Sequence, residues 1–125
     1  MKVPQALIVE DVTDLAVIFA QAIAAAGYEV TTLADGLLAQ TYLNETVPDL
    51  ILLDIHLPHL RGDKLFQHLH RDPQFNQTKI IIVTADSHRG EELREEVDLV
   101  LLKPISYLQL RDLTSRLATV QKSPG

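Results

Sequence analysis

The sequence has no cysteine, which excludes disulfides and any metal site built on thiolates. It has no apolar run near the ~20 residues that span a bilayer, and Met1 is not followed by the basic, apolar and small-residue regions of a secretion signal. Acidic residues number 17 and basic residues 11, so the net charge of −6 argues against direct binding to nucleic acid. We therefore expect a cytoplasmic protein that contacts neither membranes nor nucleic acid.

The chain does contain short aliphatic runs that alternate with amphipathic stretches. Its 125 residues, 46% of them hydrophobic, suit one globular domain over residues 1–120, with 121–125 as a C-terminal tail or the start of a linker. The runs predict strands at residues 6–9, 28–33, 50–54, 80–84 and 99–102. The intervening stretches predict helices at residues 12–26, 36–45, 63–70, 88–96 and 106–119.

This alternation is typical of an α/β fold with a doubly wound parallel sheet and right-handed crossovers. Five strands with five flanking helices fit the strand order 2-1-3-4-5. The run Leu50–Leu53 is aliphatic throughout, as a strand covered on both faces would be, and it leads directly into Asp54. Asp54 should therefore lie at the carboxyl edge of the sheet, where such folds bind ligands.

Polar residues end four of the five runs. Glu10 and Asp11 follow the first, Asp54 ends the third, Thr84 the fourth and Lys103 the fifth. Three carboxylates at one edge would repel each other, and Mg²⁺, which prefers oxygen ligands, would relieve that repulsion. A carboxylate can also act as a nucleophile toward phosphorus, and the cation, the ammonium and the hydroxyl would each hold one phosphoryl oxygen. The set predicts an aspartyl-phosphate site.

Each of these residues also has a purely structural explanation. Asp54 could cap the following turn, and the pair Glu10 and Asp11 could stabilise the N-terminus of the first helix. Thr84 could cap the fourth helix, and Lys103 could be a solvated surface residue. The five histidines read as solvated or incidental rather than as ligands of a transition metal.

Over residues 5–119 the chain resembles the receiver domain of response regulators in two-component signal transduction, which has a flavodoxin-like fold. The matching motifs, in order, are Glu10-Asp11, Asp54, Pro58, Gly62, Thr84-Ala85 and Lys103-Pro104. The resemblance implies a phosphoprotein and a signalling domain rather than an enzyme, one that catalyses only its own phosphorylation and slow autodephosphorylation.

The resemblance implies a role for each matching residue. Asp54 would be the phosphoacceptor and a magnesium ligand. Asp11 would bind Mg²⁺ directly, Glu10 would bind it through a water, and His56 would contribute its backbone carbonyl.

The phosphoryl group would come from a phosphohistidine of a histidine kinase or phosphotransfer protein. Lys103 would bind a phosphoryl oxygen and pair with Asp54 before phosphorylation, and Thr84 would turn inward to meet the phosphoryl group. The Lys103–Pro104 peptide would be cis. The output partner or domain stays unknown, and we expect a monomer or a weak dimer.

The sequence departs from the family pattern in three places. Val100 stands where the family usually has an aromatic switch residue. The segment from Thr84 to Lys103 is short, so we expect a short or loosely held fourth helix. His56 and Asp86 occupy the positions that in the family tune phosphoryl lifetime.

Two other functions stay open. The domain could be an interaction module whose output does not depend on phosphorylation, which the missing aromatic residue favours. It could also be a Mg²⁺-dependent phosphatase acting on an external substrate. Such enzymes carry a second carboxylate two residues after the nucleophile, and His56 stands at that position here.

Overall fold

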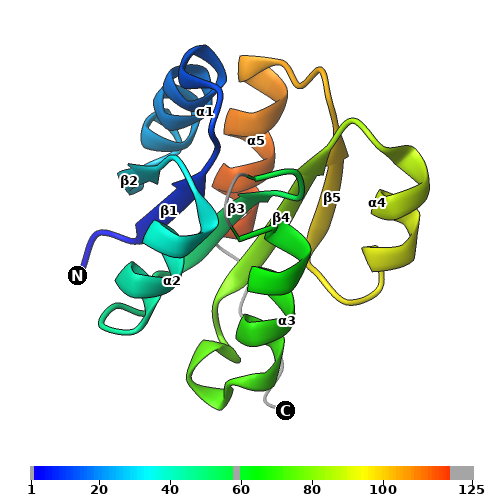
Figure 1. Ribbon diagram of the computed structural model, residues 1–125. Helices are drawn as coiled ribbons and strands as arrows, with labels where there is room; N and C mark the ends of the chain where they lie inside the picture. The colour runs from blue at the N-terminus through cyan, green and yellow to red at the C-terminus, as the bar shows by residue number, and fades with distance from the viewer. Residues whose placement is uncertain (1, 58–59, 119–125) are drawn as a thin grey trace.

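A computed structural model describes residues 2–57 and 60–118, so Pro58 and the expected tail at residues 121–125 lie outside the described residues. Strands and helices alternate along the chain, as the sequence predicts (Figure 1). The elements are β1 (Gln5–Val9), α1 (Thr13–Ala25), β2 (Glu29–Leu33), α2 (Gly36–Leu43), β3 (Leu50–Asp54), α3 (Gly62–Arg71), the 3-10 helix η1 (Pro73–Phe75), β4 (Lys79–Thr84), α4 (Ser87–Leu93), β5 (Leu99–Leu102) and α5 (Tyr107–Leu117).

The described strands form one parallel sheet in the order β2-β1-β3-β4-β5, which confirms the predicted topology. β3 lies at the centre, and its five residues are all buried. In the register Val9 is opposite Leu53 and Asp54 is opposite Val83, so the carboxyl ends of β1, β3 and β4 lie side by side. The positions predicted to carry the chemistry therefore share one edge of the sheet.

Two hydrophobic layers cover the sheet. Alternate side chains of the strands point to opposite faces, as the period of two in a strand requires. On one face they pack against Phe19 and Ile23 of α1 and Leu110 of α5. On the other face they pack against α2, α3 and α4, with Phe66 and Leu93 among the contacts. Figure 1 shows α1 and α5 together on one side of the sheet and the other helices across from them.

The layer of α1 and α5 is tied to the start of β2 by a buried hydrogen bond. The hydroxyl of Tyr28 donates to the backbone carbonyl of Thr114 over 3.0 Å, and burial raises the pKa of Tyr28 to about 12. Thr114 is itself fully buried in α5 and donates to the Leu110 carbonyl. Gly27, just past the end of α1, has φ +106°, the left-handed conformation that glycine favours at a helix C-terminus.

The fourth helix is shorter than the sequence predicts. It ends at Leu93 rather than near residue 96. The reason is the entry into β5, where Asp98 N donates to the Ile80 carbonyl and Asp98 Oδ2 accepts from Ile80 N over 2.7 Å. These bonds pull the chain onto the sheet, and only Gly90 and Leu93 of α4 are buried.

The start of α3 is packed directly against the end of β3. Gly62 is buried, its N–H donates to the Ile55 carbonyl over 3.0 Å, and a Cβ on Gly62 would overlap the Asp54 carbonyl oxygen. The glycine in the family motif therefore has a physical reason here, because a larger residue would push α3 away from Asp54. None of the helices within the described ranges is long and apolar enough to cross a membrane.

We expect Gly62→Ala to destabilise the protein by more than about 2 kcal/mol in urea unfolding, because the new methyl group meets backbone that cannot move cheaply. Helix propensity alone predicts the opposite, a gain of roughly 0.5–1 kcal/mol. The control is Gln67→Ala on the exposed side of the same helix, which should stay within about 0.5 kcal/mol of wild type. A neutral or stabilising Gly62→Ala would contradict the packing argument.

Candidate functional site

Three carboxylates meet at the carboxyl edge of the sheet, as the sequence predicts. Glu10 and Asp11 follow β1, and Asp54 is the last residue of β3. One oxygen of each carboxylate lies within 4.8 Å of the others. Glu10 and Asp54 are buried and Asp11 is exposed, so the cluster opens to solvent on the Asp11 side.

Lys103 joins the two buried carboxylates. Its Nζ lies 2.8 Å from Glu10 Oε1 and 3.0 Å from Asp54 Oδ2. The backbone N–H of Lys103 donates to the Thr84 carbonyl over 2.9 Å, and the Lys103–Pro104 peptide is cis, as the resemblance implies. The lysine side chain is 21% exposed, so the interpretation of Lys103 as a solvated surface residue is wrong.

The cluster contains three carboxylates and one ammonium, so it has fewer positive than negative groups. Burial raises the pKa of Glu10 to about 7; the nearby ammonium of Lys103 opposes this rise and the neighbouring Asp54 adds to it. Burial lowers the pKa of Lys103, but the two carboxylates outweigh it and the net shift is upward. Glu10 Oε1 is fully buried and, although Lys103 is near, has no well-aligned hydrogen bond. Such an atom suits an additional cation or a bound water.

The remaining oxygen of Asp54 serves the local backbone. Asp54 Oδ1 accepts from the N–H of His56 over 2.9 Å, so Asp54 caps its turn as well as pairing with Lys103. The structural and the functional interpretations of Asp54 are therefore compatible. The His56 residue is exposed, and the ligand role of its carbonyl stays a prediction.

Thr84 is fully buried at the end of β4. Its Oγ1 accepts from the N–H of Asp86 over 3.0 Å, which turns the hydroxyl toward the start of α4. The cap of α4 is Asp86, whose carboxylate accepts from Arg89 N over 3.1 Å, so the interpretation of Thr84 as the cap is wrong. The carboxylate of Asp86 is thereby engaged in the helix.

An ion pair that the sequence did not predict joins α3 to α4 beside this edge. Arg89 of α4 lies 3.2 Å from Asp63 of α3 and 2.6 Å from Glu92. By contrast, Arg94 and Glu91 pair with each other on the exposed side of this segment. Arg89 and Asp63 are 26 positions apart in the sequence, which leaves no local signal for their contact.

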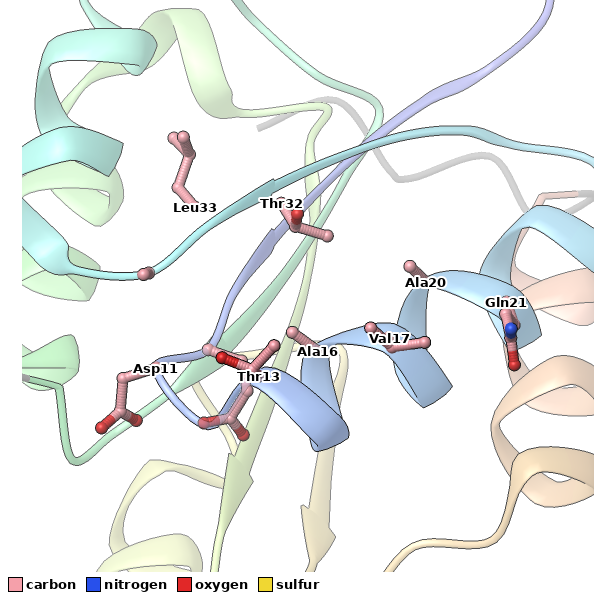
Figure 2. A pocket seen from close by; sticks show the side chains of 10 residues that line it. Asp11, Thr13, Ala16, Val17, Ala20, Gln21, Thr32 and Leu33 are labelled. Atoms are coloured by element: carbon pink, nitrogen blue, oxygen red, sulfur yellow. The ribbon is translucent and has the colours of Figure 1, made fainter.

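A groove of about 340 Å³ runs from the acidic cluster along α1 and the outer strand β2 (Figure 2). Ala16, Val17 and Ala20 of α1 line one side, Thr32 of β2 lines the other, and Asp11 lies at one end. The groove is mostly apolar, so the polar chemistry of this edge is confined to the cluster itself.

Comparisons with known proteins agree with this geometry. The family model described as the response regulator receiver domain matches residues 6–115. The phosphate regulon transcriptional regulatory protein PhoB of Rhizobium meliloti is 34% identical over 110 residues, 86% of this chain and 48% of that protein. The polar-differentiation response regulator DivK of Brucella anthropi is 36% identical over 103 residues, 80% of this chain and 84% of that protein. The chain thus spans about half of the first relative and most of the second.

Among solved structures, the receiver domain of a sensor histidine kinase from Pseudomonas aeruginosa superposes with a TM-score of 0.80 at 24% identity. The match covers 94% of this chain and all of that one. At this identity the likeness is one of fold. That structure holds a magnesium ion coordinated in its active site cleft.

We expect Lys103→Met to lower the free energy of unfolding by roughly 2–3 kcal/mol at about pH 8, because two buried carboxylates lose their shared cation. The pKa of Glu10, which burial already raises to about 7, then rises further above its unfolded value, so the lost stability should return as the pH falls and this carboxyl binds a proton. Urea unfolding at about pH 8 and about pH 5.5 measures this difference.

The matched control is Arg94→Met, which removes an exposed pair and should cost less than about 1 kcal/mol at both pH values. A Lys103→Met variant whose loss of stability is the same at both pH values would show that the carboxylates do not depend on the ammonium.

Proposed function

Because the chain belongs to the response regulator receiver domain family, we propose that Asp54 accepts a phosphoryl group and thereby switches the binding of a partner. The observation that supports this most directly is the Lys103 ammonium 3.0 Å from a carboxylate that ends the buried central strand. The proposed donor is a phosphohistidine of a histidine kinase or phosphotransfer protein. Receiver domains are signalling domains rather than enzymes with an external substrate.

In the proposed transfer, a carboxylate oxygen of Asp54 attacks phosphorus and the phosphorus–nitrogen bond of phosphohistidine breaks. The electron pair of that bond returns to the imidazole, and Asp54 becomes an acyl phosphate. Lys103 exchanges its contact with the carboxylate for one with a phosphoryl oxygen. Thr84 turns its hydroxyl from the N–H of Asp86 to a second phosphoryl oxygen.

The same cluster fits magnesium, because three carboxylates offer oxygen atoms within 4.8 Å of one another. We propose that Asp11 and Asp54 hold the ion directly, Glu10 through a water and His56 through its carbonyl. When bound, the ion supplies positive charge beside the acceptor oxygen. Lys103 then no longer has to neutralise Glu10 and Asp54 alone.

The second candidate is a receiver-fold interaction module that does not respond to phosphorylation, and Val100 in place of the usual aromatic residue favours it. The phosphatase alternative is disfavoured by His56, which offers no second carboxylate. The output partner, the cytoplasmic location and the monomeric or weakly dimeric state stay predictions.

Incubation with acetyl phosphate and Mg²⁺ should add one phosphoryl group to the wild-type chain, measured by intact mass. Asp54→Asn should take no label, because an amide is not a nucleophile toward phosphorus. Asp112→Asn, a change on the exposed side of α5, should label like wild type. Label retained by Asp54→Asn would refute the acceptor assignment, and a wild-type chain that binds neither phosphoryl nor beryllofluoride would favour the interaction module.

We expect the apparent affinity for Mg²⁺ to fall about tenfold between about pH 8 and about pH 6, because a proton with a pKa of about 7 on Glu10 competes with the cation. Isothermal titration of the unphosphorylated chain measures it. Glu10→Gln should flatten the pH profile, and Glu91→Gln, a surface control on α4, should leave it unchanged. A steep profile that persists in Glu10→Gln would show that another group takes up the proton.

A further inference from the structure

The backbone of α4 lies directly on the side chain of Thr84. Gly90 is buried, and a Cβ placed on it would be 3.3 Å from Thr84 Cγ2 and 2.9 Å from Val100 Cγ1. Leu102 Cδ2 is the third neighbour, at 3.6 Å. No side chain separates the helix from these methyl groups, so the position of α4 and the position of Thr84 constrain each other.

Val100 cannot take over the part of a switch residue. It is β-branched, which leaves it stiff at χ1, and its methyl group already contacts the helix. A side chain that cannot swing leaves the helix itself as the element that can move when Thr84 turns. The small Gly90 and the compact Val100 fit together as one contact, so the missing aromatic residue is replaced by helix backbone.

α4 is held in place by few interactions. Its seven residues bury only Gly90 and Leu93. Arg89 adds the ion pair to Asp63 at 3.2 Å, with side chains 28% and 14% exposed. Asp63 follows Gly62, which packs on the Asp54 carbonyl. The other carboxylate oxygen of Asp63 lies 3.4 Å from Nε of Arg61. The ion pair between Arg89 and Asp63 therefore connects α4 to the start of α3, which packs against the end of β3.

We propose that Arg89 is a positioning residue, which through Asp63 holds α4 down on Thr84 and so keeps the Thr84 hydroxyl on Asp86 N until α4 is displaced. The proposal rests on the proposed function, because it assumes that Thr84 turns toward a phosphoryl group. The displacement of α4 would then replace the rotation of an aromatic side chain.

The displacement of α4 and the turning of Thr84 are thermodynamically linked in this proposal. If Thr84 turns only when α4 is displaced, any change that weakens the contacts of α4 raises the fraction of molecules in which Thr84 can meet a phosphoryl group. Phosphorylation should then become faster, although no atom of Arg89 touches Asp54 in the contacts described. A purely structural role predicts lower stability without a faster reaction.

The test compares Arg89→Gln with Arg94→Gln in the full chain. Both changes remove a guanidinium from the same segment, but within the described residues Arg94 pairs only with Glu91, one turn away, at 2.9 Å. We expect Arg89→Gln to raise the maximal rate of labelling by acetyl phosphate about two- to fivefold, the range of a partly exposed ion pair. Arg94→Gln should stay at the wild-type rate. Equal rates in the two variants would overturn the proposal.

A second readout does not require phosphorylation. The methyl resonance of Thr84 should shift in Arg89→Gln and stay in place in Arg94→Gln, and the amides of α4 should exchange faster in the first variant only. If the wild-type chain takes no label, the proposed function fails, and this readout still decides whether Arg89 positions Thr84. An unchanged Thr84 methyl in Arg89→Gln overturns the positioning role.

The contact itself is tested by a double-mutant cycle. Gly90→Ala should displace α4 and shift the Thr84 methyl, because its Cβ would crowd Val100 and Thr84. Adding Val100→Ala removes the nearest atom and should return the methyl resonance part of the way to its wild-type position. If Gly90→Ala leaves Thr84 unperturbed, or if Val100→Ala gives no rescue, the helix is not seated on Thr84 as proposed.

Discussion

The ammonium of Lys103 lies between two buried carboxylates, and the rest of this edge of the sheet depends on it. Glu10 follows β1, Asp54 ends β3 and Lys103 follows β5, so one group connects three strand ends. β4 separates β5 from β3, and a long, flexible side chain is needed to reach across it. The raised pKa of Glu10 indicates that this single charge does not fully offset the burial of that carboxyl.

Much of this arrangement could be predicted from the sequence because its causes are local. The aliphatic run before Asp54 required a strand buried on both faces, and the alternation of runs and amphipathic stretches required a parallel sheet. Once the sheet order is known, the residues at the strand ends must meet. Two helix caps are of the same local kind, since Asp35 accepts from Leu38 N over 2.8 Å and Gly27 has a positive φ.

What could not be predicted depends on contacts between distant segments. Nothing near Arg89 in the sequence points to Asp63, and nothing near Gly62 points to the Asp54 carbonyl. In the sequence, Val100 indicates only the loss of an aromatic residue. The structure shows that the backbone of α4 at Gly90 packs against Val100. An absent side chain is visible in a sequence, but the group that fills its space is visible only in three dimensions.

The two helical layers are anchored very differently. The helices α1 and α5 share an apolar core, and the hydroxyl of Tyr28, just before β2, donates to the carbonyl of the fully buried Thr114 in α5, whereas α4 is held by two buried residues and a partly exposed ion pair. Rigidity is thus unevenly distributed across the sheet. Spectroscopic labels on α1 and α5 should therefore keep a constant distance when α4 moves on the opposite face. That distance can serve as an internal reference for displacements elsewhere in the domain.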